Sequence, residues 1–166
     1  TGIADLICYA LQQEGLSESE ARKRLWFVDV EGLVVKERKG LMSHNEPYMH
    51  EHEQIGFIDA INDIKPNVLI GATGAPNTFT RGVIEAMSSV NERPTIFALS
   101  NPASRAECTA LEAYEWSCGK VIFVSGSPFP ALDYEGKKYT PGQGNNVYIF
   151  PGIGLGTIIS KAAVIT

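Results

Sequence analysis

Hydrophobic residues recur along this chain in two patterns, some at helical spacing and some in short unbroken runs. Apolar side chains between Leu6 and Leu11 keep the helical spacing, and they predict an opening helix that stops near Gly15. The segment Ser17-Glu18-Ser19-Glu20 has the S-x-x-E form, in which the serine oxygen and the glutamate carboxylate accept the free amide hydrogens of a helix start. A short second helix is expected to begin there.

Unbroken hydrophobic runs are typical of strands that helices cover on both faces. The runs are residues 25–30, interrupted only by Asp29, then 68–70, 95–99, 121–124 and, as a fifth candidate, 147–150. Helical patterns lie between them. They cover residues 57–64, a stretch that follows a Thr80 cap, and a stretch that starts at the capping box Thr109-Ala110-Leu111-Glu112 and ends near Gly119.

Strands that alternate with helices predict right-handed crossovers and a parallel sheet with helices on both sides. The expected fold class is α/β, with a doubly wound, mostly parallel sheet of the Rossmann type. Residues 127–146 are rich in proline and glycine, so a long ordered loop is expected there rather than another helix. The length and the absence of an evident linker predict that residues 1–166 form a single domain.

Composition narrows the classes of function. The net charge of -5 gives no electrostatic case for a nucleic acid partner. No run of 18 apolar residues and no basic-then-apolar leader is visible, so neither a membrane span nor an export signal is predicted. The three cysteines, Cys8, Cys108 and Cys118, contain no C-x-x-C pair, which fits reducing surroundings rather than a disulfide framework or a thiolate metal site.

Small polar residues gather where predicted strands run out, and the carboxyl edge of a parallel sheet is where such folds bind ligands. These residues are Ser100 and Asn101, then Ser125-Gly126-Ser127, and then Asn145 with Asn146. Pro102 cannot continue a strand ladder, so the chain turns away after Asn101 and leaves an exposed amide that both donates and accepts.

Two further segments are typical of dinucleotide binding, although neither is specific alone. Gly71-Ala72-Thr73-Gly74 follows a predicted strand, and small residues there allow close approach of a dinucleotide, but a tight strand exit also uses glycine. Asp29 lies at a strand end, where a carboxylate can accept hydrogen bonds from ribose hydroxyls, or can instead serve a turn or a helix cap. A complete G-x-G-x-x-G loop is absent.

In this order, the segments resemble the cofactor-binding domain of malic enzymes. Asn91-Glu92-Arg93-Pro94 and Ala106-Glu107-Cys108-Thr109 extend the match, and the similarity runs from Thr1-Gly2-Ile3-Ala4 to Gly152-Ile153-Gly154-Leu155-Gly156. The resemblance implies that the chain begins just after the family's glycine-rich phosphate loop and lacks the first strand of the fold. An isolated fragment of that kind is expected to be poorly stable.

The resemblance also implies roles for individual residues. Asp29, Gly71, Ala72, Thr73 and Gly74 are expected to bind the cofactor, and Asn101 is expected to contact both the substrate and the nicotinamide side of the cofactor. Asn145 and Asn146 match a pair at the malate pocket, of which at least one donates to a substrate carboxylate and the other is free to stabilise its own loop. The metal ligands and the acid-base residues of the family lie upstream, so no catalytic residue and no metal ligand is expected in this chain.

The activity implied is oxidative decarboxylation of L-malate to pyruvate and CO2, with reduction of NAD or NADP and help from Mn2+ or Mg2+ bound mainly outside this chain. The fragment alone is expected to be inactive, and the full-length protein to be a homo-oligomer, a dimer or tetramer, in the cytoplasm or in the mitochondrial or plastid matrix. A malolactic enzyme, which forms lactate and CO2, and a non-catalytic dinucleotide-binding module are the alternatives.

Charge near the ribose favours NAD over NADP. A 2'-phosphate needs positive charge, and NADP-using malic enzymes tend to offer Ser and Lys after the ribose Asp and a further Lys in the next loop. The matching stretches here are Val30-Glu31 and Asn45-Glu46-Pro47. Lys36, Arg38 and Lys39 keep NADP open.

Three other sites are not favoured. His50-Glu51-His52-Glu53 contains metal-binding residue types, but a mixed-charge loop is more often solvated, and no further cluster supports a metal site. Cys108 and Cys118 are interpreted as packing residues of a helical stretch. Ser127 lacks the G-x-S-x-G elbow of a hydrolase.

Overall fold

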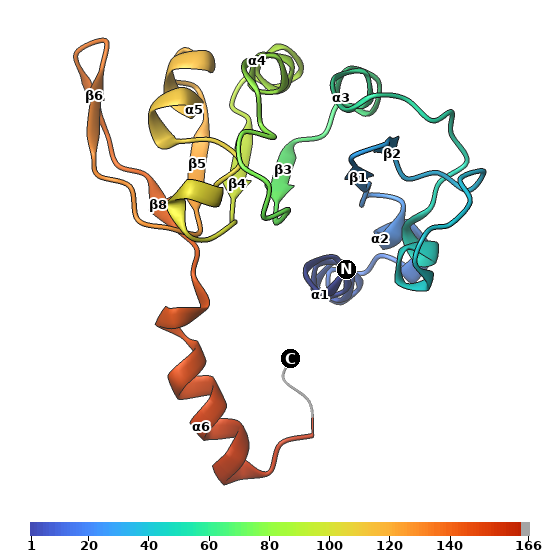
Figure 1. Ribbon diagram of the computed structural model, residues 1–166. Helices are drawn as coiled ribbons and strands as arrows, with labels where there is room; N and C mark the ends of the chain where they lie inside the picture. Colours follow the sequence, from blue (N-terminus) through green and yellow to red (C-terminus); the bar gives the residue numbers. More distant parts are fainter. Residues whose placement is uncertain (164–166) are drawn as a thin grey trace. The chain divides into compact units, whose positions relative to one another are not determined.

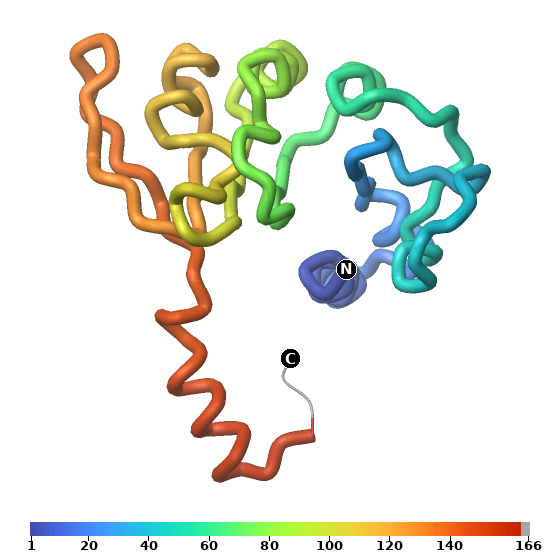
Figure 2. Tube along the Cα trace, viewed as in Figure 1, coloured from blue at the N-terminus to red at the C-terminus, as the bar shows by residue number. Residues whose placement is uncertain are grey.

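The computed structural model describes residues 1–163 and divides into two compact units, Thr1–Ile64 and Lys65–Thr166 (Figures 1 and 2). The expectation of a single domain stays a prediction. In the part of the chain that is described, no helix is both long enough and apolar enough to cross a membrane.

The first unit contains three helices, a short hairpin and a 3-10 helix. Its elements are α1 (Gly2–Gln13), α2 (Glu18–Arg22), β1 (Val28–Asp29), β2 (Gly32–Leu33), η1 (Ser43–Tyr48) and α3 (Phe57–Ile64). The capping box that the sequence predicts for α2 is present, since the Ser17 hydroxyl accepts from the Glu20 amide and the Glu20 carboxylate accepts from the Ser17 amide. The predicted opening helix and the helix over residues 57–64 are likewise confirmed.

The predicted strand over residues 25–30 is wrong in extent and in pairing. Only Val28–Asp29 is a strand, and it pairs antiparallel with Gly32–Leu33. The reason is the turn at Val30-Glu31, after which Gly32 opens β2 with a φ of +107° that favours glycine. Apolar residues of the run pack locally instead, with Trp26 and Val28 against the cluster of Leu33, Val35 and Ala60.

The second unit is built on a four-stranded parallel sheet in the order β3-β4-β5-β8, which confirms the α/β, Rossmann-type class. The strands are β3 (Val68–Gly71), β4 (Thr95–Ala98), β5 (Ile122–Ser125) and β8 (Gly142–Gln143), and the crossover helices are α4 (Arg81–Val90) and α5 (Ala110–Trp116). Both helices start as predicted, because the Thr80 and Thr109 hydroxyls accept from Val83 and Glu112 amides. A short 3-10 helix, η2 (Ala103–Arg105), follows β4.

The two faces of this sheet differ. The crossovers β3-α4-β4 and β4-α5-β5 advance in one direction, so right-handed connections place α4 and α5 together on one face, where they contact each other (Figure 1). Ile96, Ala98 and Phe123 are buried. Val68 and Ile122 share a register level and stay partly exposed, so the helices of this unit cover one face of the sheet rather than both.

Two predictions after β5 are wrong. The long loop expected over residues 127–146 contains the hairpin β6 (Leu132–Tyr134) and β7 (Lys137–Tyr139), because Glu135 and Gly136 both take positive φ and form a tight two-residue turn. The fifth strand candidate, residues 147–150, is instead the 3-10 helix η3 (Asn146–Tyr148) and the start of α6 (Phe150–Ser160). Proline in the first turn of α6 suits a helix start and not a central strand.

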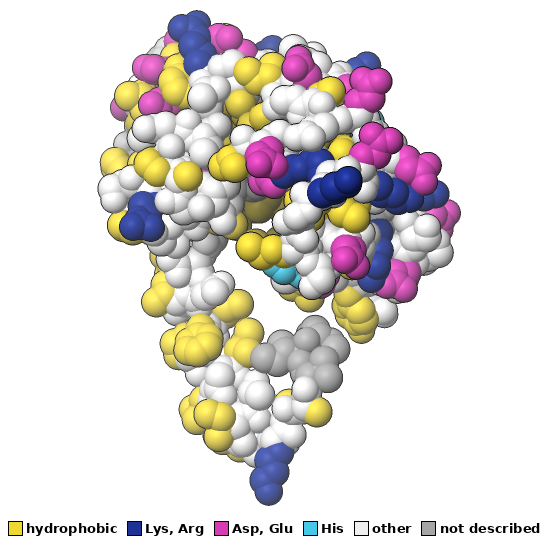
Figure 3. Space-filling model, turned by 45° about the vertical axis from the view of Figure 1, so that its right-hand side comes forward, with side chains coloured by type: hydrophobic (Ala, Val, Ile, Leu, Met, Phe, Trp, Pro, Cys, Tyr) yellow, Lys and Arg dark blue, Asp and Glu magenta, His cyan; other side chains and the backbone are white. Residues whose placement is uncertain are grey.

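Helix α6 is apolar around its whole circumference and lies largely exposed. Figure 3 shows hydrophobic side chains along this part of the molecule. The most exposed of them are Phe150, Leu155, Ile158 and Ile159, each at least 60% exposed. A helix of this character is usually buried in its native setting.

Candidate functional site

The carboxyl edge of the second unit's sheet gathers several of the residues predicted from the sequence. The register places Gly71, Ala98 and Ser125 at one level, so the loops that follow β3, β4 and β5 leave the sheet side by side. The loops are linked directly, because the Gly74 amide donates to the Ser100 hydroxyl oxygen at 2.9 Å. Gly71-Ala72-Thr73-Gly74 and Asn101 therefore lie on neighbouring loops.

Glu107, which the sequence reasoning did not select, lies between these two loops. Its side chain is completely buried. It accepts from the Thr73 amide at 3.0 Å, from the Thr73 hydroxyl at 3.1 Å, from the Ser100 amide at 3.3 Å and, in a short hydrogen bond, from the Ser100 hydroxyl. The one available signal was a charged residue between the apolar Ala106 and Cys108, both of which are buried.

These hydrogen bonds keep Glu107 ionised. Burial alone raises the pKa of a carboxyl group, but the hydrogen bonds from Ser100, from the Thr73 amide and from nearby backbone outweigh burial and hold the pKa of Glu107 below its ordinary value. The loop after β3 thus rests on a buried negative charge.

The small residues after β3 serve close packing rather than amide donation. A Cβ added to Gly71 would lie 2.6 Å from the Glu107 side chain and 2.7 Å from Phe79, so only glycine fits there. The amides of Thr73 and Gly74 are already used by Glu107 and Ser100. A ligand at this loop could therefore pack closely against the backbone, but it could not accept hydrogen bonds from the Thr73 and Gly74 amides.

The Asn101 side chain is exposed and oriented by one strong hydrogen bond. The Ser127 hydroxyl donates to Asn101 Oδ1 at 2.6 Å, whereas Asn101 Nδ2 makes only a long contact of 3.4 Å with the Leu99 carbonyl. Gly126 allows this approach, because a Cβ there would collide with the Leu99 carbonyl and with Asn101 Nδ2. The arrangement leaves an amide N–H group to donate to a ligand.

Asn145 and Asn146 differ sharply. Asn145 Nδ2 donates to the Gly126 carbonyl at 2.8 Å, and its Oδ1 accepts from the Val147 amide at 2.9 Å, so both ends of the amide serve the loop itself. The Asn146 side chain is exposed and has no hydrogen bond to any residue in the described range 1–163. Of the pair, only Asn146 has a free amide.

In the first unit, Asp29 forms a two-point ion pair with Arg38. Arg38 donates to Asp29 Oδ1 at 3.0 Å and to Oδ2 at 2.8 Å, and it also donates to Glu31 at 2.8 Å. The Glu31 amide donates to Asp29 Oδ1 at 2.9 Å. Oδ1 has two donors and Oδ2 one, so Oδ2 has room for a further donor such as a hydroxyl.

The pKa of Asp29 reflects this pairing. Burial raises it, but the hydrogen bond from Arg38, the Glu31 amide and the Arg38 charge together hold the pKa of Asp29 below its ordinary value. The Asp29 side chain keeps an exposure of 39%, whereas that of Arg38 is only 7%. The carboxylate is therefore both ionised and accessible.

The histidine-rich segment is tied into the first unit by contacts that do not resemble a metal site. His50 Nε2 lies 2.8 Å from the Leu25 carbonyl, and its ring stacks on Trp26 with 3.8 Å between centroids. His52 pairs with Asp63 at 2.7 Å. Within residues 1–163 no group of three or more His, Cys, Asp or Glu side chains is arranged to hold a metal ion.

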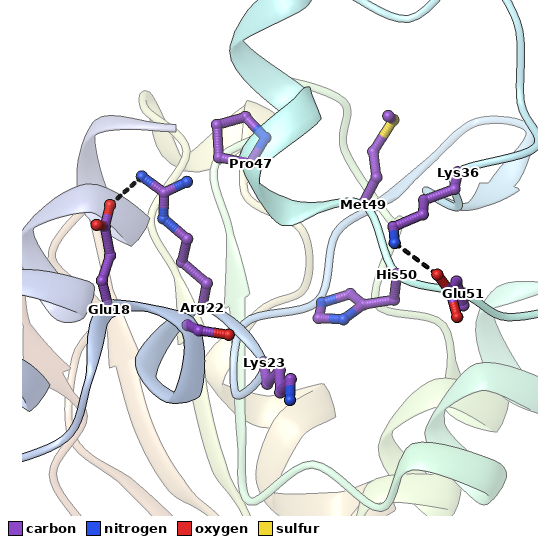
Figure 4. Close-up of a pocket in the computed structure, with 9 residues that line it drawn as sticks. Glu18, Arg22, Lys23, Lys36, Pro47, Met49, His50 and Glu51 are labelled. Carbon is purple, nitrogen blue, oxygen red and sulfur yellow. Dashed lines mark hydrogen bonds and ion pairs between the residues drawn. The ribbon is translucent and has the colours of Figure 1, made fainter.

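A pocket of about 620 Å³ lies beside His50 and carries charged side chains from both signs (Figure 4). Arg22 pairs with Glu18 at 2.5 Å and Lys36 pairs with Glu51 at 2.8 Å on its walls. Of the residues considered for cofactor or substrate, only Lys36, an alternative partner of a 2'-phosphate, lines this pocket.

The cysteine interpretation is half right. Cys108 is buried immediately before α5, and burial raises the pKa of its thiol to about 12, which fits a packing role. Cys118 is exposed, follows α5 and has a φ of +51°. Neither residue belongs to a helix. The Ser127 hydroxyl donates to Asn101, and within residues 1–163 no histidine is hydrogen-bonded to it.

The chain matches known proteins along its whole length. The family profile described as "Malic enzyme, NAD binding domain" covers residues 1–166. The chain is 54% identical over 165 residues to NADP-dependent malic enzyme 3 of Arabidopsis thaliana. It is 55% identical over 165 residues to the chloroplastic NADP-dependent malic enzyme of Zea mays, and 53% over 165 residues to that of Solanum lycopersicum.

These relatives are much longer than the chain. Each alignment covers 98% of the chain, but the matched part is 28% of the Arabidopsis protein, 26% of the maize protein and 29% of the tomato protein. The chain therefore corresponds to one part of such a protein.

Proposed function

The chain belongs to the family of malic enzyme NAD-binding domains, and on this premise we propose that the protein containing it converts L-malate to pyruvate and CO2 while reducing a nicotinamide dinucleotide. The observation that carries the proposal is the sheet edge of the second unit, where the Gly71–Gly74 loop and the Ser100-Asn101 loop adjoin in a chain whose relatives are named malic enzymes. The chain aligns with less than a third of the length of each of those relatives, so we assign the activity to the whole protein and not to this chain alone.

The roles we assign follow from what each side chain has free. The cofactor, when bound, supplies the acceptor for the hydride that leaves malate C2. Asp29 Oδ2 accepts from a ribose hydroxyl, because Arg38 leaves that atom one open position. Gly71, Ala72, Thr73 and Gly74 allow the dinucleotide to approach the backbone.

We assign the substrate contacts to two asparagines, Asn101 and Asn146. Asn101 Nδ2, oriented through the Ser127 hydroxyl, donates at the reacting end of the site to substrate and cofactor. Asn146 donates to a malate carboxylate, because its amide has no other partner among the described residues. Asn145, the other residue of the predicted pair, stabilises the loop through Gly126 and Val147.

For the cofactor, charge and relatives point in different directions. The relatives are named NADP-dependent, so they give no support to NAD. Around the ribose position, however, Asp29 and Glu31 share the single charge of Arg38, which leaves a net negative charge where a 2'-phosphate would sit. We therefore keep NAD as the proposed preference, with NADP as the competing outcome.

No ligand of the divalent metal is assigned among the described residues. Residues 1–163 hold no group of ligating side chains for it, so we assign no metal ligand here and derive no step through the metal. The proposal leaves Mn2+ or Mg2+, together with the acid-base residues, to parts of the protein outside the matched region.

We also propose a compartment and an oligomeric state for the full-length protein. Two of the relatives are named chloroplastic, which supports the plastid among the compartments expected from the sequence. A homo-oligomer is proposed for the full-length protein, and light scattering of that protein would measure its mass.

Steady-state kinetics of the native full-length protein test the proposed activity. With L-malate, a divalent metal and either dinucleotide, we expect reduced nicotinamide and pyruvate to form in equal amounts. Lactate without net reduction of the dinucleotide would favour a malolactic enzyme. Dinucleotide binding without any dependence on malate would favour a non-catalytic module.

A further inference from the structure

Glu107 is the one fully buried carboxylate in the described structure, and none of the roles above uses it. It comes from the segment between η2 and α5, and it lies buried behind the loops rather than on their exposed side. Its partners are Thr73, from the loop after β3, and Ser100, from the loop after β4. One side chain thus joins the two loops of the second unit that carry candidate cofactor residues.

The chemistry of the contacts requires a carboxylate. Thr73 and Ser100 each present a backbone N–H group, which can only donate, to opposite oxygens of Glu107. A carboxylate accepts at both oxygens, whereas an amide of the same shape would turn an NH2 group toward one of these donors. Ionisation of Glu107, favoured by the same hydrogen bonds, keeps both oxygens as acceptors.

The network extends from Glu107 to the ligand side of the loops. The Ser100 hydroxyl donates to Glu107 and accepts from the Gly74 amide. The Thr73 hydroxyl donates to Glu107 and accepts from the Ala75 amide at 3.1 Å. Asn101 follows Ser100 directly, so the position of its amide depends on where the Ser100 backbone is held.

Stability alone is a weak reason for such a group. Replacing a buried ion pair by apolar side chains is often neutral or stabilising in proteins, because the free energy needed to remove the charges from water can exceed that of the interactions they make inside. We infer that Glu107 is a positioning residue, which fixes the spacing of the Gly71–Gly74 loop and the Ser100-Asn101 loop and so sets the affinity of the site for the nicotinamide dinucleotide. This inference rests on the proposed function.

Ser117 offers a matched control. It is equally buried, at 1% exposure, and its hydroxyl also joins two backbone segments, donating to the Tyr114 carbonyl and accepting from the Val121 amide. It lies where α5 leads into β5, at the opposite edge of the sheet from the loops. Removing its hydroxyl costs a buried hydrogen bond without touching the candidate site.

The experiment compares Glu107→Gln with Ser117→Ala in the native full-length protein, measuring the dissociation constant for reduced dinucleotide by fluorescence and the unfolding midpoint by calorimetry. We expect Glu107→Gln to weaken dinucleotide binding roughly tenfold or more, the scale of one buried hydrogen bond left unpaired. Ser117→Ala is expected to lower the unfolding midpoint but to change binding less than about twofold, because it removes a hydrogen bond remote from the site.

Some results would contradict only this inference, and another would also contradict the proposed function. Wild-type affinity in Glu107→Gln, or equal weakening in both variants, contradicts a positioning role while leaving dinucleotide binding intact. Failure of the wild-type protein to bind dinucleotide contradicts the proposed function and this inference together. If Glu107→Gln does not fold, Thr73→Val and Ser100→Ala decide instead, since each removes one hydroxyl bond to the carboxylate. Weakened binding in both supports the inference, and unchanged binding overturns it.

Discussion

The Ser127 hydroxyl donates to Asn101 Oδ1 at 2.6 Å, and this single bond decides which end of the Asn101 amide faces outward. With Oδ1 occupied, the NH2 group is left to donate. Ser127 is buried and Asn101 is exposed, so the oriented group sits at the surface on a fixed support. The first prediction concerns this pair.

Asn101→Ala in the full-length protein is expected to lower malate turnover about a hundredfold or more, because losing one positioned donor costs roughly 2.7 to 4 kcal/mol in well-studied sites. Ser127→Ala keeps the amide but frees its rotation, so a smaller loss is expected. Steady-state kinetics with malate measure both. Unchanged turnover in Asn101→Ala would mean that the residue only shapes its loop.

The asparagine pair before η3 gives the second prediction. Asn146→Ala is expected to raise the malate KM with little change in dinucleotide affinity, because its amide is free for a carboxylate. Asn145→Ala is expected to lower the unfolding midpoint instead, since it removes the bonds to Gly126 and Val147. A larger malate effect from Asn145→Ala than from Asn146→Ala would reverse the assignment.

The third prediction concerns cofactor preference. The combined change Glu31→Ser and Asn45→Lys is expected to move preference toward NADP, because it removes a carboxylate beside Asp29 and releases Arg38 from one of its partners. Unit charges about 4 Å apart interact by up to ~4 kcal/mol at intermediate dielectric. The gain should shrink at high salt. The measurement is kcat/KM for each dinucleotide at saturating malate and metal.

Arg38→Gln is the matched test of the same site. It should weaken the binding of both NAD and NADP, because it removes the ion pair that orients Asp29. A wild-type protein that already prefers NADP would contradict the proposed preference. It would point instead to Lys36, Arg38 or Lys39 as partners of the 2'-phosphate.

The fourth prediction is a pH dependence of stability through His52. Hydrogen bonds to the Glu53 carbonyl and to Asp63 raise the pKa of His52 above its ordinary value of 6.5. A group with a raised folded-state pKa stabilises the fold fully below its unfolded pKa, and this contribution disappears as the pH rises through the folded value. His52→Gln should therefore destabilise the protein at a pH below 6.5 and have little effect above the raised pKa.

Urea unfolding of wild type and His52→Gln at both pH values measures this difference. Asp63→Asn is the control, because it keeps the size of the side chain and removes the charge that pairs with the imidazolium. An equal destabilisation by His52→Gln at both pH values would show that the ring acts through packing against Trp26 rather than through its charge.

The local signals of the sequence predicted most of the fold. Helix starts such as Thr109 with Glu112 depend on residues three positions apart, so they are visible in the sequence. The strand over residues 25–30 was overpredicted because hydrophobicity alone cannot reveal that the chain turns back at Val30-Glu31. The turn at Glu135-Gly136 was missed because the surrounding prolines and glycines suggested an irregular loop.

The loops that form the candidate site could be predicted from the sequence, but the buried residue that holds them together could not. Asn101 and the Gly71–Gly74 loop follow strands, and parallel pairing brings strand ends together. Glu107 was not predictable, because its partner Thr73 lies 34 positions away and nothing local reveals that contact. Likewise the sequence alone left open which of Asn145 and Asn146 serves the loop, and only the hydrogen bonds of Asn145 separate them.

The central claim is that the protein oxidises malate at a dinucleotide seated on this sheet edge, and the fate of the hydrogen at malate C2 tests it most directly. The native full-length protein would be given L-malate deuterated at C2, a divalent metal and oxidised dinucleotide, and the products analysed by mass spectrometry. We predict deuterium in the reduced nicotinamide, together with pyruvate and CO2. Deuterium found in lactate, or malate recovered unchanged, would contradict the account.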